Sequence, residues 1–431
     1  MTNFANPCII RMLRIRHRGR PVLPIEEHGT DRPPMPPFFE NAHAGTKKKA
    51  IQKGDFLMHF SLSLRAARRL SLAALYMLTV LAMLLSAVGC SKVENPIHEN
   101  NTSDVTEPVE TESSNVPQDN TPGFYNILNG ESCSQEQAQI RPLAIMVNNI
   151  KASLPQVGLE KADIIYECEA EGTITRLLAL FSHYADITEP IGSIRSSREY
   201  FIDFAANHDA IYIHAGGSTE AYSQLASRNI DHIDGLTSNA FYRDQNRRAM
   251  GMAIEHTLVS TGDRLARAIQ DKGFRTELDT AYTAPFLFSH TEKVVPTEGV
   301  AQEISTKYSS FQYSAFQYDQ ASQKYLRTEF GTPHIDANTG NQLSFDNVIV
   351  LFCKYTYTGD AKNHIMVETV GSGEGYYCTG GKYQKIKWAK AGQDTPMVLN
   401  DSHGNQLIVN PGKTFITVMD TADATSGFSI Q

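Results

Sequence analysis

Three acidic side chains alternate along one short segment of the chain, at Glu167, Glu169 and Glu171. They continue an apolar run, residues 162–169, whose composition predicts a β-strand. Successive side chains of a strand point to opposite faces, so the three carboxylates are expected on one face. Like charges on one face repel one another unless cations or a partner neutralise them. The run is therefore the first candidate for chemistry.

Three explanations of these glutamates are open. The one we favour is pairing with Arg176, Arg195 and Arg198, or simple exposure to solvent. A divalent-cation site would use the carboxylate oxygens as hard ligands. In the third explanation, two of the carboxylates act as general acid and general base.

The segment Arg195-Ser196-Ser197-Arg198 places two guanidinium groups three residues apart. At the start of a helix they would share a face beside backbone N–H groups that lack helical partners. Such an arrangement can hold a phosphate or a carboxylate. It can equally provide the counter-charge for the glutamates, and we slightly favour this internal pairing.

His214 and Ser218 flank a glycine turn, Gly216-Gly217, between a predicted strand and a predicted helix. His214 lies at the carboxyl end of the strand, where α/β folds place ligands, although a hydrogen-bonded structural histidine is the commoner outcome. The segment lacks the glycine spacings of nucleotide-binding loops. It also lacks the G-x-S-x-G turn of serine hydrolases, so neither function is predicted.

The elements that must position these residues alternate between strand and helix. Apolar runs predict strands at 143–147, 162–169, 177–181 and 210–214, and helices are expected at 198–208, 218–228 and 263–272. This alternation predicts an α/β first domain, residues 124–290. A linker, residues 291–305, follows it.

Residues 306–431 change character, because the helical period disappears and β-branched and aromatic residues alternate. Runs of this kind occupy 347–352, 365–370, 376–378, 384–388 and 413–418, with glycine turns between them. We predict a mostly β second domain, which makes the overall class α+β. No cofactor is predicted for either domain.

The N-terminal region predicts export and lipidation. Residues 1–57 have no apolar period and are interpreted as a disordered or misassigned leader, with Met58 as the true start. Residues 58–89 combine basic, apolar and small-residue regions in the order of a signal peptide. Cys90 directly follows, as in a lipobox, so it is expected to carry the lipid. Residues 90–123 are rich in Ser, Thr, Asn, Glu and Pro and are expected to form a disordered tether.

Composition narrows the choice of function. The chain has 431 residues and is 41% apolar and 20% charged. Residues 1–89 hold 13 basic and 5 acidic side chains, so residues 90–431 carry a net charge of −16. Such a body would repel a phosphate backbone, so no nucleic-acid partner is expected. The remaining cysteines, Cys133, Cys168, Cys353 and Cys378, show no C-x-x-C spacing, so metal-finger and thioredoxin-type sites are not predicted and disulfides stay open.

Several long motifs resemble the YerB-like family of bacterial lipoproteins, which has two domains of unknown function. The resemblance covers about residues 140–420 and is carried by segments 141–149, 156–159, 162–167, 171–176, 191–198, 209–218, 241–244, 256–257, 371–373, 387–388 and 410–414. It implies the two-domain fold and a location on the outer face of the bacterial cell membrane, held there by a lipid anchor. It implies no reaction.

Two classes of function follow. The favoured one is a non-catalytic lipoprotein whose first domain binds a cell-wall polymer or an envelope protein. The alternative is a cell-envelope hydrolase, directed at glycans, that uses the carboxylates of the Glu167–Glu171 strand. In either case the candidate site residues are Glu167, Glu169, Glu171, Arg176, Arg195, Arg198, His214 and Ser218.

Overall fold

The computed structural model describes residues 123–431. The predicted leader, signal peptide, lipidation site Cys90 and almost all of the tether therefore lie outside the described residues. Within the described part, no helix is long and apolar enough to cross a membrane.

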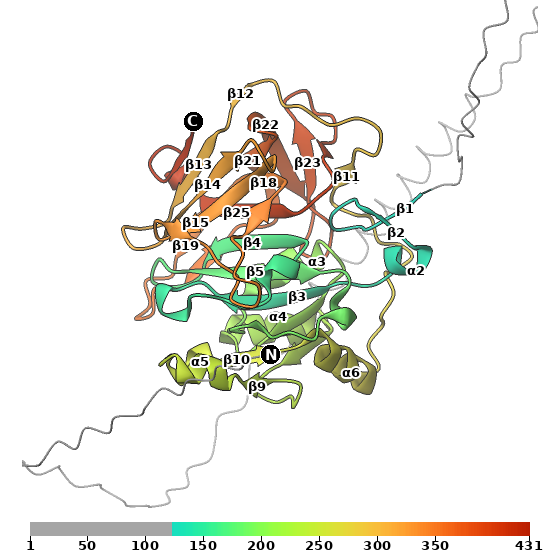
Figure 1. Cartoon of the computed structure of the whole chain (residues 1–431), viewed down its shortest axis with the longest axis vertical. Coiled ribbons are helices and arrows are strands. Elements are labelled where there is room, and N and C mark those ends of the chain that lie inside the picture. The colour runs from blue at the N-terminus through green and yellow to red at the C-terminus, as the bar shows by residue number, and fades with distance from the viewer. Residues whose placement is uncertain (1–122) are drawn as a thin grey trace, which may run out of the picture. The chain divides into compact units, whose positions relative to one another are not determined.

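One large mixed β-sheet forms the centre of the fold (Figure 1). Its strands follow the order β12-β22-β21-β18-β25-β4-β5-β3-β7-β8, and β23 pairs with β22. Their bounds are β3 (Leu143–Asn148), β4 (Ile164–Glu169), β5 (Thr175–Phe181), β7 (Ile211–His214), β8 (His232–Asp234), β12 (Gly299–Val300), β18 (Asn347–Cys353), β21 (Gly371–Thr379), β22 (Lys382–Lys390), β23 (Val398–Asp401) and β25 (Thr414–Asp420).

The sheet runs through both halves of the sequence. β25, from the C-terminal half, pairs in parallel with β4 on one side and with β18 on the other. Figure 1 shows the green strands of the first half continuing directly into the orange strands of the second. The central strands are buried on both faces, which explains why they read as continuous apolar runs.

Four helices belong to the first half of the described chain besides the short α2 (Gln135–Ala138): α3 (Glu199–Ala206), α4 (Thr219–Ser227), α5 (Gln245–Ala249) and α6 (Gly262–Lys272). The side chains of α3 share one apolar cluster with one face of the large sheet. The apolar stripe of α6, which includes Leu265 and Ile269, packs on the opposite face. Gly273 ends α6 in a left-handed conformation with φ +67, which suits glycine.

A second, smaller sheet covers the large sheet in the C-terminal half. Its order is β16-β15-β14-β13-β26, with β17 pairing to β15. Buried side chains of this sheet, including Ile304 and Phe316, join one core with Val350 and Phe415 of the large sheet. The bounds are β13 (Glu303–Lys307), β14 (Tyr313–Asp319), β15 (Lys324–Glu329), β16 (Thr332–Pro333), β17 (Ser344–Phe345) and β26 (Phe428–Ile430).

Short pairings complete the structure. They are β1 (Phe124–Tyr125) with β2 (Ser132–Cys133), β6 (Ile191–Gly192) with β10 (Leu258–Ser260) and β9 (Tyr242–Arg243), β11 (Leu287–Phe288) with β24 (Ile408–Val409), and β19 (Tyr355–Tyr357) with β20 (Ile365–Val367). Short 3-10 turns lie at Lys151–Ser153, Leu159–Lys161, Tyr184–Asp186, Ile254–His256 and Thr421–Asp423. The predicted class is confirmed: an α/β first part is followed by a mostly β second part.

Candidate functional site

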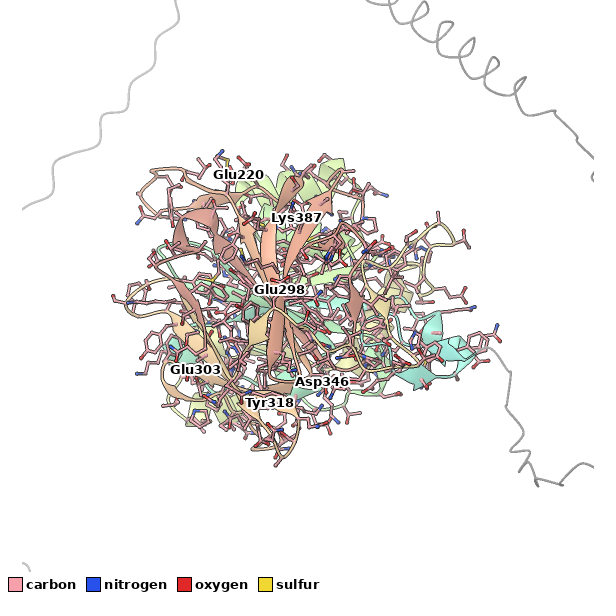
Figure 2. The ribbon with its side chains drawn as sticks, turned by 90° about the horizontal axis from the view of Figure 1, so that it is seen from above. Glu220, Glu298, Glu303, Tyr318, Asp346 and Lys387 are labelled. Carbon is pink, nitrogen blue, oxygen red and sulfur yellow. The ribbon has the colours of Figure 1, made fainter. Side chains whose placement is uncertain are left out.

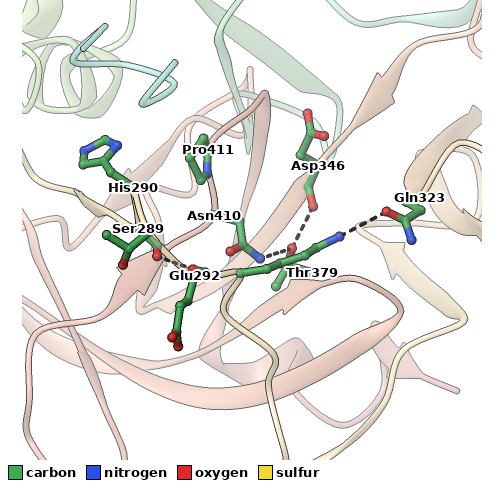
Figure 3. A pocket seen from close by; sticks show the side chains of 10 residues that line it. Ser289, His290, Glu292, Gln323, Asp346, Thr379, Asn410 and Pro411 are labelled. Carbon is green, nitrogen blue, oxygen red and sulfur yellow. Dashed lines mark hydrogen bonds between the residues drawn. The ribbon is translucent and has the colours of Figure 1, made fainter. Parts of the chain in front are cut away.

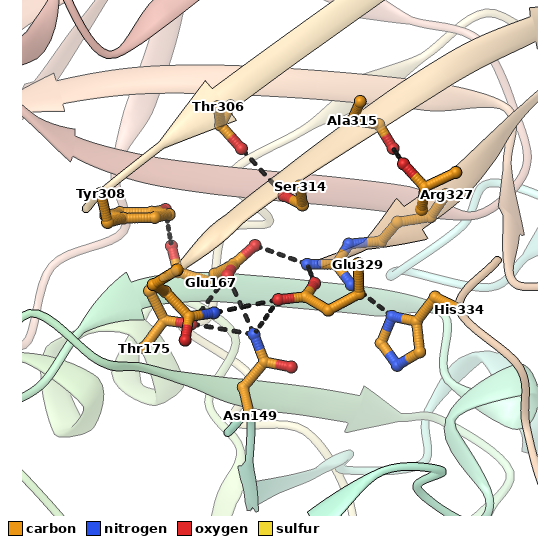
Figure 4. A network of polar contacts seen from close by, with 12 residues as sticks. Asn149, Glu167, Thr175, Thr306, Tyr308, Ser314, Ala315, Arg327, Glu329 and His334 are labelled. Carbon is orange, nitrogen blue, oxygen red and sulfur yellow. Dashed lines mark hydrogen bonds and ion pairs between the residues drawn. The ribbon is translucent and has the colours of Figure 1, made fainter. Parts of the chain in front are cut away.

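Glu167 lies in the interior of the protein, on β4. Its side chain accepts hydrogen bonds from Asn149 Nδ2 at 3.0 Å and from Thr175 Oγ1 at 2.8 Å, and Arg327 NH2 pairs with it at 2.7 Å (Figure 4). Glu167 has no exposed surface. Its counter-charge is therefore Arg327 from β15, a residue that the sequence did not single out.

Arg327 is also completely buried and pairs with a second carboxylate, Glu329. Burial raises the pKa of Glu329 and, together with Arg327, holds the pKa of His334 well below its usual range. The neutral His334 ring bonds Arg327 on one side and the Gln156 side-chain oxygen, at 2.6 Å, on the other. This network joins the two halves of the chain and has no opening to solvent at Glu167.

Glu169 is 2% exposed, and its Oε1 atom has no hydrogen-bond partner within residues 123–431. Burial, reinforced by the neighbouring Asp423 carboxylate, raises the pKa of Glu169 to about 7. The Tyr357 hydroxyl lies 3.5 Å from the other carboxylate oxygen. Glu169 is thus partly protonated at neutral pH, which lowers the cost of its burial.

Glu171 forms ion pairs with two of the three arginines that were predicted as its partners. Arg198 NH2 lies 2.6 Å from Glu171, and Arg176 pairs with the other carboxylate oxygen. Arg176 also donates to the Ser196 carbonyl at 2.9 Å. Burial and the nearby Arg198 lower the pKa of Arg176 to about 10. The Glu171 carboxylate is therefore paired with two guanidinium groups, so the charge around Glu171 is positive overall.

Arg195 stands apart from these ion pairs. Its NH1 group donates to the Glu255 carbonyl at 3.3 Å, and its Nε atom is buried without a partner in the described chain. Burial lowers the pKa of Arg195, while the Glu171 carboxylate acts in the opposite direction.

His214 and Ser218 have structural partners. His214 Nδ1 lies 2.8 Å from the Gly216 carbonyl, and its Nε2 lies 2.9 Å from His232 Nδ1. Burial lowers the pKa of His214. Ser218 is the N-cap of α4 and accepts a bond from the Ala221 N–H at 3.0 Å. Ser218 also borders the cavity described next.

An open cavity of about 470 Å³ lies between the N-terminal ends of α3 and α4 and the β19–β20 hairpin. We call it the interhelix groove. Its lining is Arg198, Glu199, Ser218, Glu220, Gln224, Thr358, Asp360, His364, Ile365, Met366 and Val367. Its volume falls in the usual range of small-ligand sites.

The groove combines apolar contacts with charges of both signs. Ile365, Met366 and Val367 supply the apolar side, whereas Arg198 and the carboxylates supply the charges. Burial, assisted by Glu220, raises the pKa of Glu199. Bonds from the backbone and ring of His364 lower the pKa of Asp360 to about 2, and the ring nitrogen lies 2.6 Å from the carboxylate.

The structure thus divides the predicted site residues. Arg198 and Ser218 line the groove, Glu171 and Arg176 stand behind Arg198, and Glu167 belongs to the separate buried network. Sequence reasoning missed Glu220, Asp360 and His364. No local motif marks these residues, although the N-cap pattern at Ser218 could have directed attention to Glu220 in the first turn of α4.

Another cavity, of about 280 Å³, lies over the Asn410–Pro411 turn (Figure 3). Its polar groups hold the turn in place: Asn410 Oδ1 accepts from the Val294 N–H at 2.7 Å, and Asp346 accepts from the Lys413 N–H, just after the turn, at 2.9 Å. In the view from above, Glu220 of the interhelix groove lies near the upper edge and Asp346 of this cavity lies in the lower half (Figure 2). The smaller cavity is therefore a separate, structural feature.

Metal-ligand groups and cysteine pairs are the remaining candidates for chemistry in the described part of the chain. Residues 123–431 contain no group of three His, Cys, Asp or Glu side chains placed to hold a metal ion. Cys133, Cys168, Cys353 and Cys378 are all free thiols.

Comparison with known proteins gives two family matches. Residues 128–275 match the N-terminal domain, and residues 304–416 the C-terminal domain, of the family described as "Protein of unknown function (DUF3048)". The chain is 28% identical over 310 residues to the protein named "Putative lipoprotein YerB" of Bacillus subtilis (strain 168), covering 69% of this chain and 87% of that protein. The crystal structure of YerB protein from Bacillus subtilis superposes with a TM-score of 0.62 at 28% identity, covering 71% of this chain and 99% of that one.

Proposed function

Because the chain belongs to the YerB-like family that combines the two DUF3048 domains, we propose that it is a membrane-anchored lipoprotein whose folded body binds a cell-envelope ligand in the interhelix groove. In this proposal Cys90 carries the lipid, and the tether holds the body at the outer face of the membrane. The name of the Bacillus subtilis relative supports the anchor.

The observation that carries the binding function is the composition of the groove. An apolar wall, an arginine and several carboxylates meet in one open cavity of about 470 Å³. Pockets of this size and mixed lining are typical of sites that orient a ligand by a few polar groups. The groove also lies where the helices α3 and α4 begin, at the carboxyl end of β7, which is the usual ligand edge of α/β sheets.

The hydrolase alternative has weaker support. A catalytic carboxylate must reach the substrate, yet Glu167 is 0% exposed and Glu169 is 2% exposed. Glu167 is also held by Arg327 at 2.7 Å. Glu171 is engaged with two arginines. We therefore propose binding as the function of this site.

A photoreactive amino acid placed at Met366 tests this function in the producing bacterium. Met366 is 50% exposed and lines the groove, so a bound ligand should form a light-dependent adduct. Gln224→Trp should fill the groove and remove the adduct. The matched control is Val300 in β12, which is 57% exposed and does not line the groove.

An adduct that forms equally at Met366 and Val300 would contradict the proposal. So would an adduct at Met366 that is unchanged in the Gln224→Trp variant, because the ligand would then lie outside the groove.

A further inference from the structure

The β19–β20 hairpin is a two-stranded sheet of its own and has an edge on the side of the groove. Three successive residues of β20, Ile365, Met366 and Val367, line the cavity. Since neighbouring side chains of a strand point to opposite faces, a cavity that touches all three runs along the backbone edge. The groove therefore exposes strand backbone as well as side chains.

The register of the hairpin shows which backbone groups face this edge. The Glu368 backbone N–H donates to the Lys354 carbonyl, and the Thr358 backbone N–H donates to the His364 carbonyl, so both residue pairs are hydrogen-bonded across the two strands. Bonded pairs alternate with non-bonded pairs in an antiparallel ladder, so Val367, opposite Tyr355, belongs to a non-bonded pair. Its N–H and C=O consequently point away from β19.

Val367 keeps these two groups unpaired within residues 123–431. The edge is closed at one end, where His364 forms an antiparallel bridge with Glu171. It is closed at the other end, where the Thr369 hydroxyl donates to Asp203 of α3 at 2.5 Å. The bridge takes up the edge as far as Ile365, so the open part of the edge is the backbone of Val367. Unpaired edge groups of this kind accept an added strand.

The charged side chains around the edge indicate which charged groups a bound ligand should carry. Arg198 is 8% exposed, borders the groove, and has a buried Nε atom without a partner in the described chain. It is also the N-cap of α3 and makes no side-chain cap bond; the Phe201 N–H donates to the Arg198 carbonyl, and Glu199 is the acidic residue of the first turn, so the Arg198 guanidinium is the group that attracts an anion. Glu220 and Asp360 offer negative charge to a basic group of the same ligand.

Resting on the binding function proposed above, we propose that the ligand is a short extended peptide. It pairs with Val367 as a third strand of the β19–β20 hairpin and places an anionic group, its C-terminal carboxylate, at Arg198. The backbone bonds give affinity, and Met366 and the charged rim select the side chains.

The test uses the full chain in detergent micelles and a library of random hexapeptides with acetylated N-termini and free C-termini. Peptides retained by the protein are identified by mass spectrometry, and the same library with amidated C-termini is the control for the carboxylate. Wild-type protein should retain a subset of the free-acid library and at least several-fold less of the amidated one.

Val367→Pro removes the edge N–H, which the hairpin does not use, and a proline is tolerated at such an edge position. The loss of one or two peptide hydrogen bonds should lower retention about tenfold. The matched variant Val367→Ala keeps the N–H but shortens a side chain that lines the groove, so it should lower retention less than Val367→Pro does. Melting temperatures of both variants report whether the hairpin remains folded. Hydrogen exchange in wild-type protein supplies a second readout, because a retained peptide should protect the Val367 amide.

Two results would overturn the inference. One is a wild-type chain that retains no peptide, or retains peptides without protecting the Val367 amide. The other is a folded Val367→Pro variant that retains peptides as well as wild type. If Gln224→Trp still removes the Met366 adduct in cells, the binding function stands while the peptide inference fails. If that adduct is also insensitive to Gln224→Trp, both fail.

Discussion

Glu167 and Arg327 lie 160 residues apart in the sequence and form a 2.7 Å ion pair in which neither side chain is more than 1% exposed. The pair connects β4 of the large sheet to β15 of the small sheet. Arg327 also pairs with Glu329, whose pKa is raised by burial, so one guanidinium balances the charge of Glu167 and holds the protonated Glu329 beside it. The stability of the junction between the two halves of the chain therefore depends strongly on Arg327.

Arg327→Ala should lower the free energy of unfolding by about 3–5 kcal/mol, because it leaves the Glu167 carboxylate buried without a counter-charge. Urea denaturation at neutral pH measures this change. Lys354→Ala is the control: its pair with Glu368 is 64% and 57% exposed, so its removal should cost less than about 1 kcal/mol. Equal effects of the two substitutions would contradict the structural role of the buried network.

Glu169→Gln should stabilise the protein at pH 8 by about 1–3 kcal/mol relative to wild type. The pKa of Glu169 is raised from 4.5 to about 7 in the folded state, so the folded protein binds the proton more tightly than the unfolded chain does. Wild-type stability should therefore decline between pH 4.5 and 7, and the glutamine removes this decline. Urea titrations at pH 4.5 and 8 test the sign. If wild type and Glu169→Gln differ in free energy of unfolding by the same amount at both pH values, the raised pKa of Glu169 is refuted.

Arg198→Ala and Arg176→Ala should have different effects, although both arginines pair with Glu171. Arg176→Ala removes a side chain that is 4% exposed and bonds the Ser196 carbonyl, so it should destabilise the protein by about 2–3 kcal/mol. Arg198→Ala should cost less, about 1–2 kcal/mol, because its side chain is 9% exposed and borders the open groove, and it should reduce the Met366 adduct several-fold. If Arg198→Ala destabilises as much as Arg176→Ala and leaves the adduct unchanged, Arg198 is a structural residue only.

Cys90→Ala should yield an uncleaved precursor that takes up no labelled fatty acid. The reason is that the thiol of Cys90 is the expected acceptor of the lipid, next to the small residue Gly89. Labelling of growing cells with radioactive palmitate, followed by gel electrophoresis, measures both processing and acylation. Cys133→Ala serves as the control and should be processed and labelled normally. Normal labelling of the Cys90→Ala protein would show that the anchor lies elsewhere.

Local pattern was sufficient to predict many of the elements. The apolar run at 143–147 lies in β3, and the helices expected at 198–208 and 218–228 contain α3 and α4. These elements follow from the short-range properties of the chain: burial on both faces for a central strand, and a serine N-cap at Ser218 for α4. The expected pairing with arginines holds for Glu171, which pairs with Arg176 and Arg198, whereas Glu167 pairs with Arg327, which the sequence did not indicate.

Tertiary structure alone decided which charges meet and where a ligand can enter. Nothing near Glu167 in the sequence indicates Arg327, because ion pairing depends on distance in space, and that distance is set by the packing of β15 against β4. The insertion of β25 between β4 and β18 likewise joins strands that are distant in the chain. The interhelix groove arises because the β19–β20 hairpin from the second half lies against the starts of α3 and α4 from the first. The sequence by itself determined the elements and their buried faces, whereas the long-range packing of those faces determined the site.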